Sequence, residues 1–192
     1  MVAEGSTSPA VVRMQVHPTA IDGLVRVTTK AVTDERGTVR EFFRTSGFAE
    51  LGVPVPDRWA QLNVTYTRHG GVRGLHGEAA DKLIGLASGV AFGAWLDTRP
   101  ESPTRGALVT LELTVGTQMF VPAGVCNGFQ SVSPDGCQYV YCFGVEWTPG
   151  MTGVAVNPLD PDLGIAWPVP VHPSDPSIVS AKDAAAPRFA EL

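Results

Sequence analysis

The chain has 192 residues, of which 44% are hydrophobic and 17% charged, and its formal net charge is −5. This length fits one domain of ordinary size with a sizeable core. The acidic balance leaves no global basic footprint, which argues against nucleic acid as a partner and makes any anion site a local one.

The cysteines and the N-terminal segment indicate where the protein works. Cys126, Cys137 and Cys142 are odd in number and lack CxxC or Cys/His spacing, so we expect reduced core residues rather than disulfides or a zinc site. The first ten residues contain no apolar signal-peptide region, and no later run has the length of a membrane span. We therefore predict a cytoplasmic protein with no membrane partner, in which residues 1–15 are flexible and residues 16–192 form a single domain.

Strand-like runs follow one another along the chain. The first are residues 24–31 and 38–43, followed by a short helical turn over residues 45–51 and by strands over residues 59–66, 82–86 and 89–96. Residues 108–115 alternate most cleanly between apolar and polar side chains, as a half-buried strand does. Residues 138–145 repeat the pattern and put Tyr139, Tyr141 and Phe143 on one face. The tail, residues 174–192, reads as short helical turns interrupted by Pro176 and Pro187.

These elements predict an all-β architecture. The chain contains 21 glycines and 16 prolines, a composition typical of many short strands joined by turns, and no long stretch has a helical apolar period. An antiparallel jelly roll or barrel of the cupin type, with short helical turns, is the expected fold. Such a barrel holds its ligand in its mouth, where side chains from several strands converge.

The four histidines do not form a metal-ligand pattern. A metal-dependent cupin would offer an HxH pair followed by a carboxylate and another histidine, but His76 is followed by Gly77 and Glu78. His17 and His172 each precede a proline, and His69 lies in a Gly-Gly turn. We therefore expect no metal and no cofactor. A lone histidine in a β domain is otherwise most simply a hydrogen-bonded structural side chain.

An ordered set of motifs changes that interpretation. The sequence resembles the dTDP-4-keto-6-deoxyglucose 3,5-epimerases (dTDP-4-dehydrorhamnose 3,5-epimerases) of the rhamnose pathway and their relatives in antibiotic deoxysugar pathways. The resemblance extends from about residue 30 to residue 183 through Asp34-Glu35-Arg36-Gly37 with Glu41, Gln61-Leu62-Asn63, Gly71-Val72-Arg73-Gly74-Leu75-His76, Lys82-Leu83, Asp97-Thr98-Arg99, Ser102-Pro103-Thr104, Val121-Pro122-Ala123-Gly124, Gly128-Phe129, Tyr141, Asp160-Pro161-Asp162-Leu163-Gly164-Ile165, Trp167-Pro168 and Ser180-Ala181-Lys182-Asp183.

The resemblance implies an epimerase that acts through an enolate. A 4-keto sugar has acidified protons at C3 and C5, and inversion there needs a base on one face, an acid on the other and a group that stabilises the oxyanion. His76 matches the family base and Asp183 the carboxylate paired with it. Lys82 is expected to stabilise the enolate, and Tyr141 matches the acid. Seen singly, Tyr141 reads as a core aromatic, Asp183 as a cap or turn residue and Lys82 as a solvated strand end.

The resemblance also implies a site for the dTDP group. The residues expected to bind the nucleotide and its diphosphate are Arg36, Glu41, Gln61, Asn63, Arg73 and Lys182. Arginine suits this task because its planar guanidinium binds phosphate oxygens through two hydrogen bonds. In the family the Arg36 segment reaches a neighbouring subunit, so a homodimer is implied.

Several positions depart from the family pattern. Asn127 stands where the family keeps a histidine, and Gly93 where it keeps an aspartate. We hypothesise that the two positions touch and that their joint change leaves Lys82 without an acidic neighbour and enlarges the site. Further departures are Val39 in place of an aromatic residue, Cys142 and Glu146 where the family favours Lys and Tyr, and a shorter segment between His76 and Lys82.

These departures predict a specialised relative that acts on a differently substituted 4-keto sugar or inverts a single carbon. The sequence leaves three other interpretations open. They are a cupin that catalyses another keto-sugar isomerisation, a non-catalytic sugar-nucleotide-binding barrel and, third, a metal-dependent oxygenase.

Overall fold

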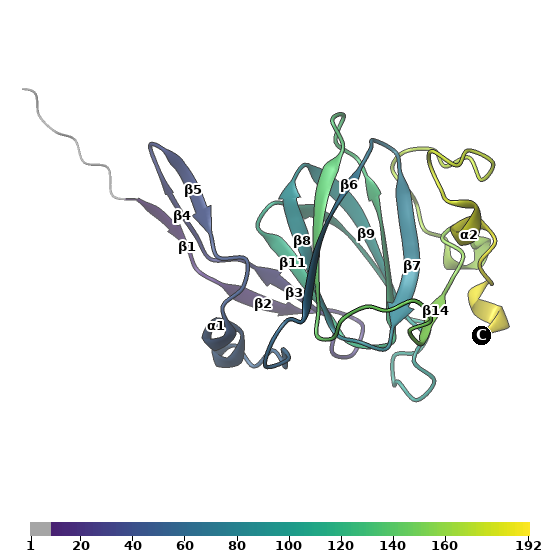
Figure 1. Cartoon of the computed structure of the whole chain (residues 1–192), viewed down its shortest axis with the longest axis horizontal. Helices are drawn as coiled ribbons and strands as arrows, with labels where there is room; N and C mark the ends of the chain where they lie inside the picture. The colour runs from purple at the N-terminus through teal and green to yellow at the C-terminus, as the bar shows by residue number, and fades with distance from the viewer. Residues whose placement is uncertain (1–8) are drawn as a thin grey trace, which may run out of the picture.

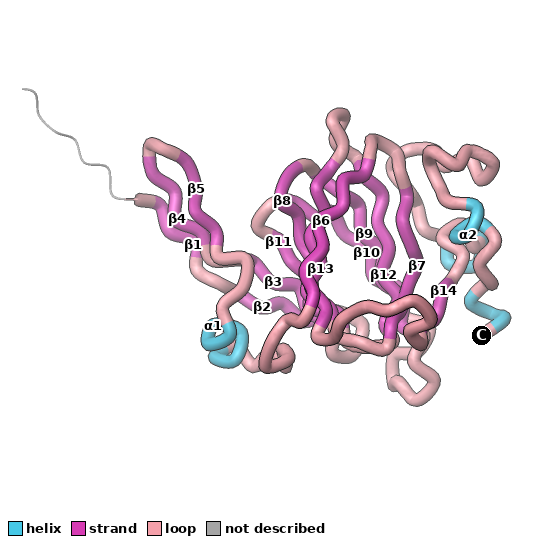
Figure 2. Tube along the Cα trace, in the orientation of Figure 1, coloured by secondary structure: helices cyan, strands magenta, loops and turns pink. Residues whose placement is uncertain are grey.

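The computed structural model describes residues 9–192, and its regular structure consists mainly of antiparallel strands (Figures 1 and 2). One sheet has five strands in the order β10 (Leu108–Thr114), β9 (Val90–Asp97), β12 (Val125–Ser131), β7 (Val72–Glu78) and β14 (Gly153–Ala155). A second has six, in the order β2 (Gln15–Pro18), β3 (Val25–Thr28), β11 (Thr117–Val121), β8 (Lys82–Ser88), β13 (Cys137–Phe143) and β6 (Gln61–Thr67). The helical elements are α1 (Thr45–Glu50), α2 (Ala181–Ala184) and the 3-10 turns η1 (Pro161–Leu163) and η2 (Phe189–Glu191). The predicted all-β jelly roll with short helical turns is confirmed.

The two large sheets enclose a shared core. Ile84 and Leu86 of β8 meet Ala91 and Trp95 of β9 there, and all four side chains are buried. Side chains on a strand alternate between its faces, so Lys82 points inward together with Ile84 and Leu86. Burial of each large apolar side chain contributes roughly 1.5–3 kcal/mol. This core closes one end of the barrel and leaves the other end for a cavity.

The outer faces of both sheets are also covered. Phe48 of α1 packs with Leu83 and Cys142 on the six-stranded sheet. The C-terminal segment, yellow in Figure 1, lies beside β7 and β14, and its side chains pack with Leu75 and Leu96. Because Leu75 is anchored on the outer face of β7, the next residue, His76, faces inward.

The sequence predicts strands best where apolar and polar residues alternate. The strands expected over residues 59–66, 82–86, 89–96, 108–115 and 138–145 correspond to β6, β8, β9, β10 and β13. The sequence does not predict β7, β11 or β12, and in β7 and β12 glycines leave positions at which no side chain marks a face.

One predicted strand belongs to two sheets. The run over residues 24–31 ends as β3 at Thr28, and Ala31 begins β4 (Ala31–Asp34). With β1 (Ala10–Val12) and β5 (Gly37–Arg40), β4 forms a three-stranded sheet that projects from the barrel (Figure 1). We call this sheet the arm. The prediction of a flexible segment over residues 1–15 falls partly outside the described residues, while residues 10–12 pair with β4. Among residues 9–192, no helix has the length and apolar character needed to cross a membrane.

A glycine contact brings β7 close to β12. Gly74 has a φ of 103°, and a Cβ there would lie 2.6 Å from the carbonyl oxygen of Asn127 and 2.7 Å from the Cα of Gly128. The register of the two strands shifts between Asn127 and Phe129. Glycine is therefore required at position 74, because any side chain would push apart the strands that carry His76 and Asn127.

Candidate active site

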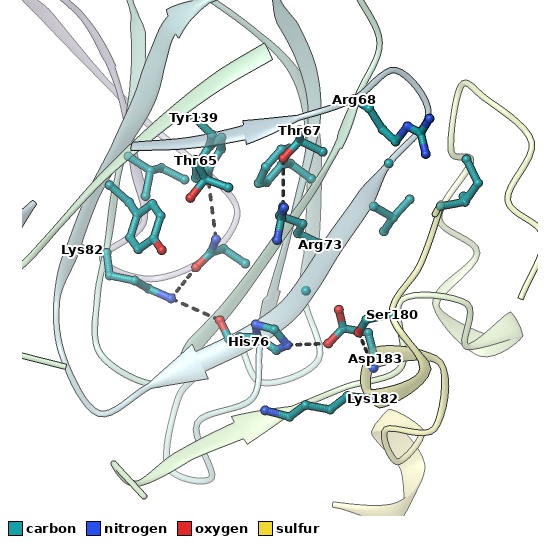
Figure 3. A pocket seen from close by; sticks show the side chains of 18 of the residues that line it. Thr65, Thr67, Arg68, Arg73, His76, Lys82, Tyr139, Ser180, Lys182 and Asp183 are labelled. Atoms are coloured by element: carbon teal, nitrogen blue, oxygen red, sulfur yellow. Dashed lines mark hydrogen bonds and ion pairs between the residues drawn. The ribbon is translucent and has the colours of Figure 1, made fainter. Parts of the chain in front are cut away.

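A cavity of about 450 Å³ opens inside the barrel. Its walls come from β6, β7, β8, β12 and β13, and residues 176–183 of the C-terminal segment form part of its rim. In the close view of Figure 3, Lys82 points toward the strand that carries His76, the His76 ring points toward Asp183, and Arg73 points toward Thr67. The four predicted catalytic residues, His76, Asp183, Lys82 and Tyr141, all line it, as do Arg73 and Lys182.

His76 and Asp183 form a close pair at the rim. His76 Nε2 lies 2.7 Å from Asp183 Oδ1, and the two side chains are 39% and 9% exposed. Burial raises the pKa of Asp183, but the hydrogen bond and the charge interaction with His76 lower it by more. The net shift of the pKa is downward. With Nε2–H donating to the carboxylate, a neutral imidazole presents an unprotonated Nδ1, which can accept a proton.

The position of Asp183 is set by the start of α2. Ser180 is the N-cap, and its Oγ accepts a hydrogen bond from the backbone N–H of Asp183 at 3.0 Å. The Ser-x-x-Asp spacing is a recognisable helix-start pattern in the sequence. The Asp183 carboxylate in addition contacts His76, and only the packing of the C-terminal segment beside β7 could determine that contact.

Lys82 lies at the floor of the cavity with a set of acceptors around it. Its Nζ donates to Glu78 Oε2 at 2.5 Å, to the carbonyl oxygen of His76 at 3.1 Å and to Asn127 Oδ1. The hypothesis that Lys82 lacks an acidic neighbour is therefore wrong. Glu78 and Lys82 are only four residues apart in the sequence, which is the one indication of this pair that the sequence offers. They lie on two strands, and the tight turn between β7 and β8 brings them together.

The hypothesis that Gly93 enlarges the site is also wrong. A Cβ at position 93 would lie 2.2 Å from Cη2 of Trp95, because the indole ring folds back over the glycine. Trp95 is fully buried and neither residue lines the cavity. The indole therefore occupies the space that a side chain at position 93 would need. In the register, Gly93 faces Phe129 and Trp95 faces Asn127, so positions 93 and 127 are diagonal neighbours on one face.

Tyr141 belongs to an aromatic wall on β13. Its ring centroid lies 6.2 Å from that of Tyr139 and 5.5 Å from that of Phe143. Tyr139 in turn stacks on Phe129 at 4.0 Å. Burial raises the pKa of Tyr139, whose hydroxyl accepts a long, 3.5 Å hydrogen bond from Asn127 Nδ2. The predicted shared face of these aromatic residues is confirmed.

The predicted nucleotide-binding residues fall into two that line the cavity, two that lie next to it on β6, and two that lie away from it. Arg73 and Lys182 line the cavity, and Arg73 Nε donates to Thr67 Oγ1 at 2.9 Å. Gln61 and Asn63 bond to each other at 3.1 Å and share the inward face of β6 with the cavity-lining Thr65 and Thr67.

Arg36 and Glu41 lie away from the cavity. Arg36, on the β4–β5 turn of the arm, has a side chain 90% exposed and paired with Asp34. Glu41 pairs with Lys30 and Arg44. Neither residue lines the cavity of its own chain.

The cysteines, His17 and His69 lie outside the cavity lining and make structural contacts. The three thiols are buried and unpaired, and burial raises the pKa of Cys126 and of Cys142 to about 11. His17 hydrogen-bonds Thr28, and His69 hydrogen-bonds the carbonyl oxygen of Ser133. Within the described part of the chain, no three His, Cys, Asp or Glu side chains gather in a way that could hold a metal ion.

Comparisons with known proteins agree on one family. Residues 18–191 match the family model described as dTDP-4-dehydrorhamnose 3,5-epimerase. The chain is 33% identical over 184 residues to a dTDP-4-dehydro-6-deoxyglucose 3-epimerase of Streptomyces bikiniensis, covering 91% of this chain and 89% of the relative.

Solved structures agree as well. A 4-keto-6-deoxy sugar epimerase from the novobiocin cluster of Streptomyces spheroides superposes with a TM-score of 0.85 at 27% identity, covering 97% of this chain and 93% of that one. A dTDP-6-deoxy-D-glucose-3,5-epimerase of Legionella pneumophila, solved with dTDP-4-keto-L-rhamnose, has a TM-score of 0.82 at 30% identity and covers 94% of this chain and 95% of that one.

Proposed function

The chain belongs to the dTDP-4-dehydrorhamnose 3,5-epimerase family, and from this premise we propose that it epimerises C3, C5 or both of a dTDP-4-keto-6-deoxyhexose through an enolate, in deoxysugar biosynthesis. It is an isomerase. The 4-keto group itself acidifies the neighbouring C–H bonds, so the reaction calls for positioned acid, base and cation, and no cofactor enters the proposal.

One observation carries the proposal: a base candidate and an acid candidate come from opposed walls of one cavity. His76 extends from the five-stranded sheet and Tyr141 from the six-stranded sheet, and both line the same space. A sugar ring between them would present one face to the imidazole and the other to the phenol. Inversion requires proton removal and proton return on opposite faces, which this arrangement allows.

The proton and electron movements follow from these positions. His76 Nδ1 takes the proton from carbon, the electron pair of the C–H bond forms the C=C bond of the enolate, and the carbonyl π pair moves to the C4 oxygen. Asp183 stabilises the resulting imidazolium through its 2.7 Å contact with Nε2. Lys82 stabilises the enolate oxygen. Tyr141 then donates its proton to the opposite face of the same carbon.

Cations near the rim support the assignment of a diphosphate ligand. Arg68, Arg73 and Lys182 line the cavity together with the hydroxyls of Thr65 and Thr67. Gln61 and Asn63 extend the same face of β6 and would bind the nucleoside. Arginine and lysine at one rim suit a dTDP group because phosphate oxygens accept several charge-assisted hydrogen bonds.

A homodimer is part of the proposal. Arg36 and Glu41 do not line their own cavity, and the projecting arm that carries Arg36 could extend over a neighbouring barrel. The outer face of the edge strand β6 exposes Leu62, Val64 and Tyr66, an apolar row suited to an interface.

If Arg36 acts in the partner's site, Arg36→Ala and His76→Ala chains, each inactive alone, regain activity when mixed and allowed to exchange subunits. The cytoplasmic location stays a prediction.

Solvent exchange tests the reaction. Incubation with dTDP-4-keto-6-deoxyglucose in deuterium oxide should incorporate deuterium at each inverted carbon, and the product stereochemistry identifies C3, C5 or both. His76→Ala should abolish incorporation, and Tyr141→Phe should block inversion. Absence of incorporation across related 4-keto sugars would contradict catalysis and favour a sugar-nucleotide-binding protein.

A further inference from the structure

The ammonium group of Lys82 directs all of its N–H bonds to acceptors of the protein itself. A protonated lysine has three N–H bonds, and Lys82 directs them to three acceptors: the Glu78 carboxylate, the His76 carbonyl and the Asn127 amide oxygen. The side chain crosses from β8 in the six-stranded sheet to β7 and β12 in the other, and only 4% of it is exposed. A substrate oxygen can therefore bond to this ammonium only by displacing one of the three.

Glu78 is the charged member of this set. It lies two residues after His76 on the same face of β7, lines the cavity, and its side chain is 20% exposed. Burial raises the pKa of Glu78, but the charge and hydrogen bond of Lys82 lower it by more, so the net shift is downward and the group is a carboxylate at neutral pH. A buried ammonium without such a partner is strongly unfavourable.

The three acceptors differ in how easily they can be replaced. Hydrogen bonds between two charged groups are roughly twice as strong as neutral ones, which favours retention of Glu78. The His76 carbonyl belongs to the backbone of β7 and cannot turn away. The Asn127 amide is neutral, and its other contact, to the Tyr139 hydroxyl, is a weak one at 3.5 Å. Asn127 is thus the acceptor that a ligand oxygen would displace.

We propose that Glu78 is the positioning residue of Lys82, holding its ammonium at the cavity floor and balancing its charge, while the substrate's C4 oxygen takes over the hydrogen bond from Asn127. The inference rests on the proposed function and adds a residue whose role is set by its contact with Lys82. As the enolate forms, negative charge grows on the C4 oxygen, so the bond to a fixed ammonium strengthens in the transition state. Loss of Glu78 should accordingly lower kcat with little effect on KM.

The main experiment compares Glu78→Gln with the parent chain. Glutamine keeps the shape and an acceptor oxygen but removes the charge. We expect kcat to fall about tenfold and KM to stay within threefold of the parent value. Lys82→Met should lose more, because removal of an oxyanion-stabilising donor costs roughly 100-fold in kcat. In the Lys82→Met background, Glu78→Gln should cause no further loss, because its effect passes through the ammonium. Glu112→Gln, at an exposed carboxylate on β10, is the matched control and should leave kcat and KM unchanged.

A second measurement does not depend on turnover. The side-chain ammonium of Lys82 should give a slowly exchanging signal in ¹⁵N-resolved NMR of the parent and of Glu112→Gln, and this signal should broaden or vanish in Glu78→Gln. If the parent shows the signal but no turnover with any 4-keto sugar, the proposed reaction fails and the positioning of Lys82 stands. If Glu78→Gln keeps the signal, or lowers kcat as much in the Lys82→Met background as in the parent, the positioning role is refuted.

The exchange at Asn127 has its own test. Asn127→Asp puts a carboxylate beside Lys82 that competes with the C4 oxygen, so KM should rise at least tenfold. An Asn127→Asp variant with unchanged KM would show that the C4 oxygen does not take that position.

Discussion

Two groups of buried charge in this protein are built alike but face different surroundings. The loop cluster follows β9 and consists of Asp97, Arg99, Ser102 and Thr104. The cavity cluster consists of Glu78, Lys82 and Asn127. In each, a carboxylate and a cation pair inside the protein at 2.8 Å or less.

The two clusters differ in whether they line a cavity. Asp97 is fully buried, and its carboxylate accepts from Arg99, Ser102 and Thr104 at 2.5–2.9 Å, all within its own loop. Arg99 also donates to the carbonyl oxygen of Asp22, which ties the loop to the N-terminal part of the chain. The cavity cluster joins three strands and opens onto the cavity. A buried ion pair is therefore not in itself the mark of a site, and its exposure to a cavity is what distinguishes the two.

The largest expected effect concerns a carboxylate that faces the cavity. Asp183→Asn removes the charge that favours the His76 imidazolium and should lower kcat by about 10⁴-fold, as loss of a histidine-orienting aspartate does elsewhere. Steady-state kinetics on correctly folded protein measures it, with the exposed Asp57→Asn as control. A loss of less than tenfold would mean that Asp183 resembles Asp97 and serves stability.

Removal of the loop carboxylate should have the opposite signature. Asp97→Ala leaves Arg99 without its partner and should lower the free energy of unfolding by about 3–5 kcal/mol, the usual cost of breaking a buried pair. Turnover per folded molecule should stay within twofold of the parent. Urea unfolding and active-site titration measure the two quantities. A large drop in kcat at unchanged stability would break the distinction between the clusters.

Strand β9 connects the two clusters, since it ends at Asp97 and its Trp95 lies opposite Asn127 of β12. Gly93→Ala should cost about 1–3 kcal/mol of stability, because the new methyl group overlaps the buried indole ring. In a double-mutant cycle with Trp95→Leu, the cost of Gly93→Ala should shrink, since the smaller side chain makes room. Additive costs would show that the indole is not what excludes a side chain at position 93.

The smallest expected effect is a dependence of stability on pH. Burial raises the pKa of Asp97, but hydrogen bonds from Arg99, Ser102 and Thr104 lower it by more, and its net pKa lies well below the usual range. A carboxyl whose pKa is lower in the folded state stabilises the fold above its unfolded pKa of roughly 4, and this contribution is lost as the pH falls further. The urea midpoint of the parent should therefore decline between about pH 5 and pH 3, and that of Asp97→Asn should decline less. Equal declines would assign the acid sensitivity to other carboxylates.

The sequence predicts most of the strands whose two faces differ. The alternation over residues 108–115 and 138–145 identifies β10 and β13, and it puts Tyr139, Tyr141 and Phe143 on one face, as their ring contacts confirm. It does not identify β7 or β12, in which glycines leave positions that no side chain assigns to a face. The break between β3 and β4 was equally invisible, since a change of sheet leaves the local propensity unaltered.

The candidate site was accessible to sequence only in part. The family resemblance selected His76, Lys82, Tyr141 and Asp183, which all line one cavity. The sequence does not show that Glu78 is the partner of Lys82. It also does not show that Trp95 fills the space beside Gly93. Both depend on side-chain direction after the chain has turned back on itself, which no local pattern encodes.

By itself, then, the sequence determined the all-β class, the family and the chemical groups available for an enolisation. Only the tertiary structure decided that the proposed base and acid stand on opposed sheets, that Lys82 has an anionic partner, and that the Asp97 carboxylate is fully buried in its loop. The physical reason is that composition and periodicity report which faces are buried, whereas a site depends on which groups meet across strands distant in sequence and on whether a cavity reaches them.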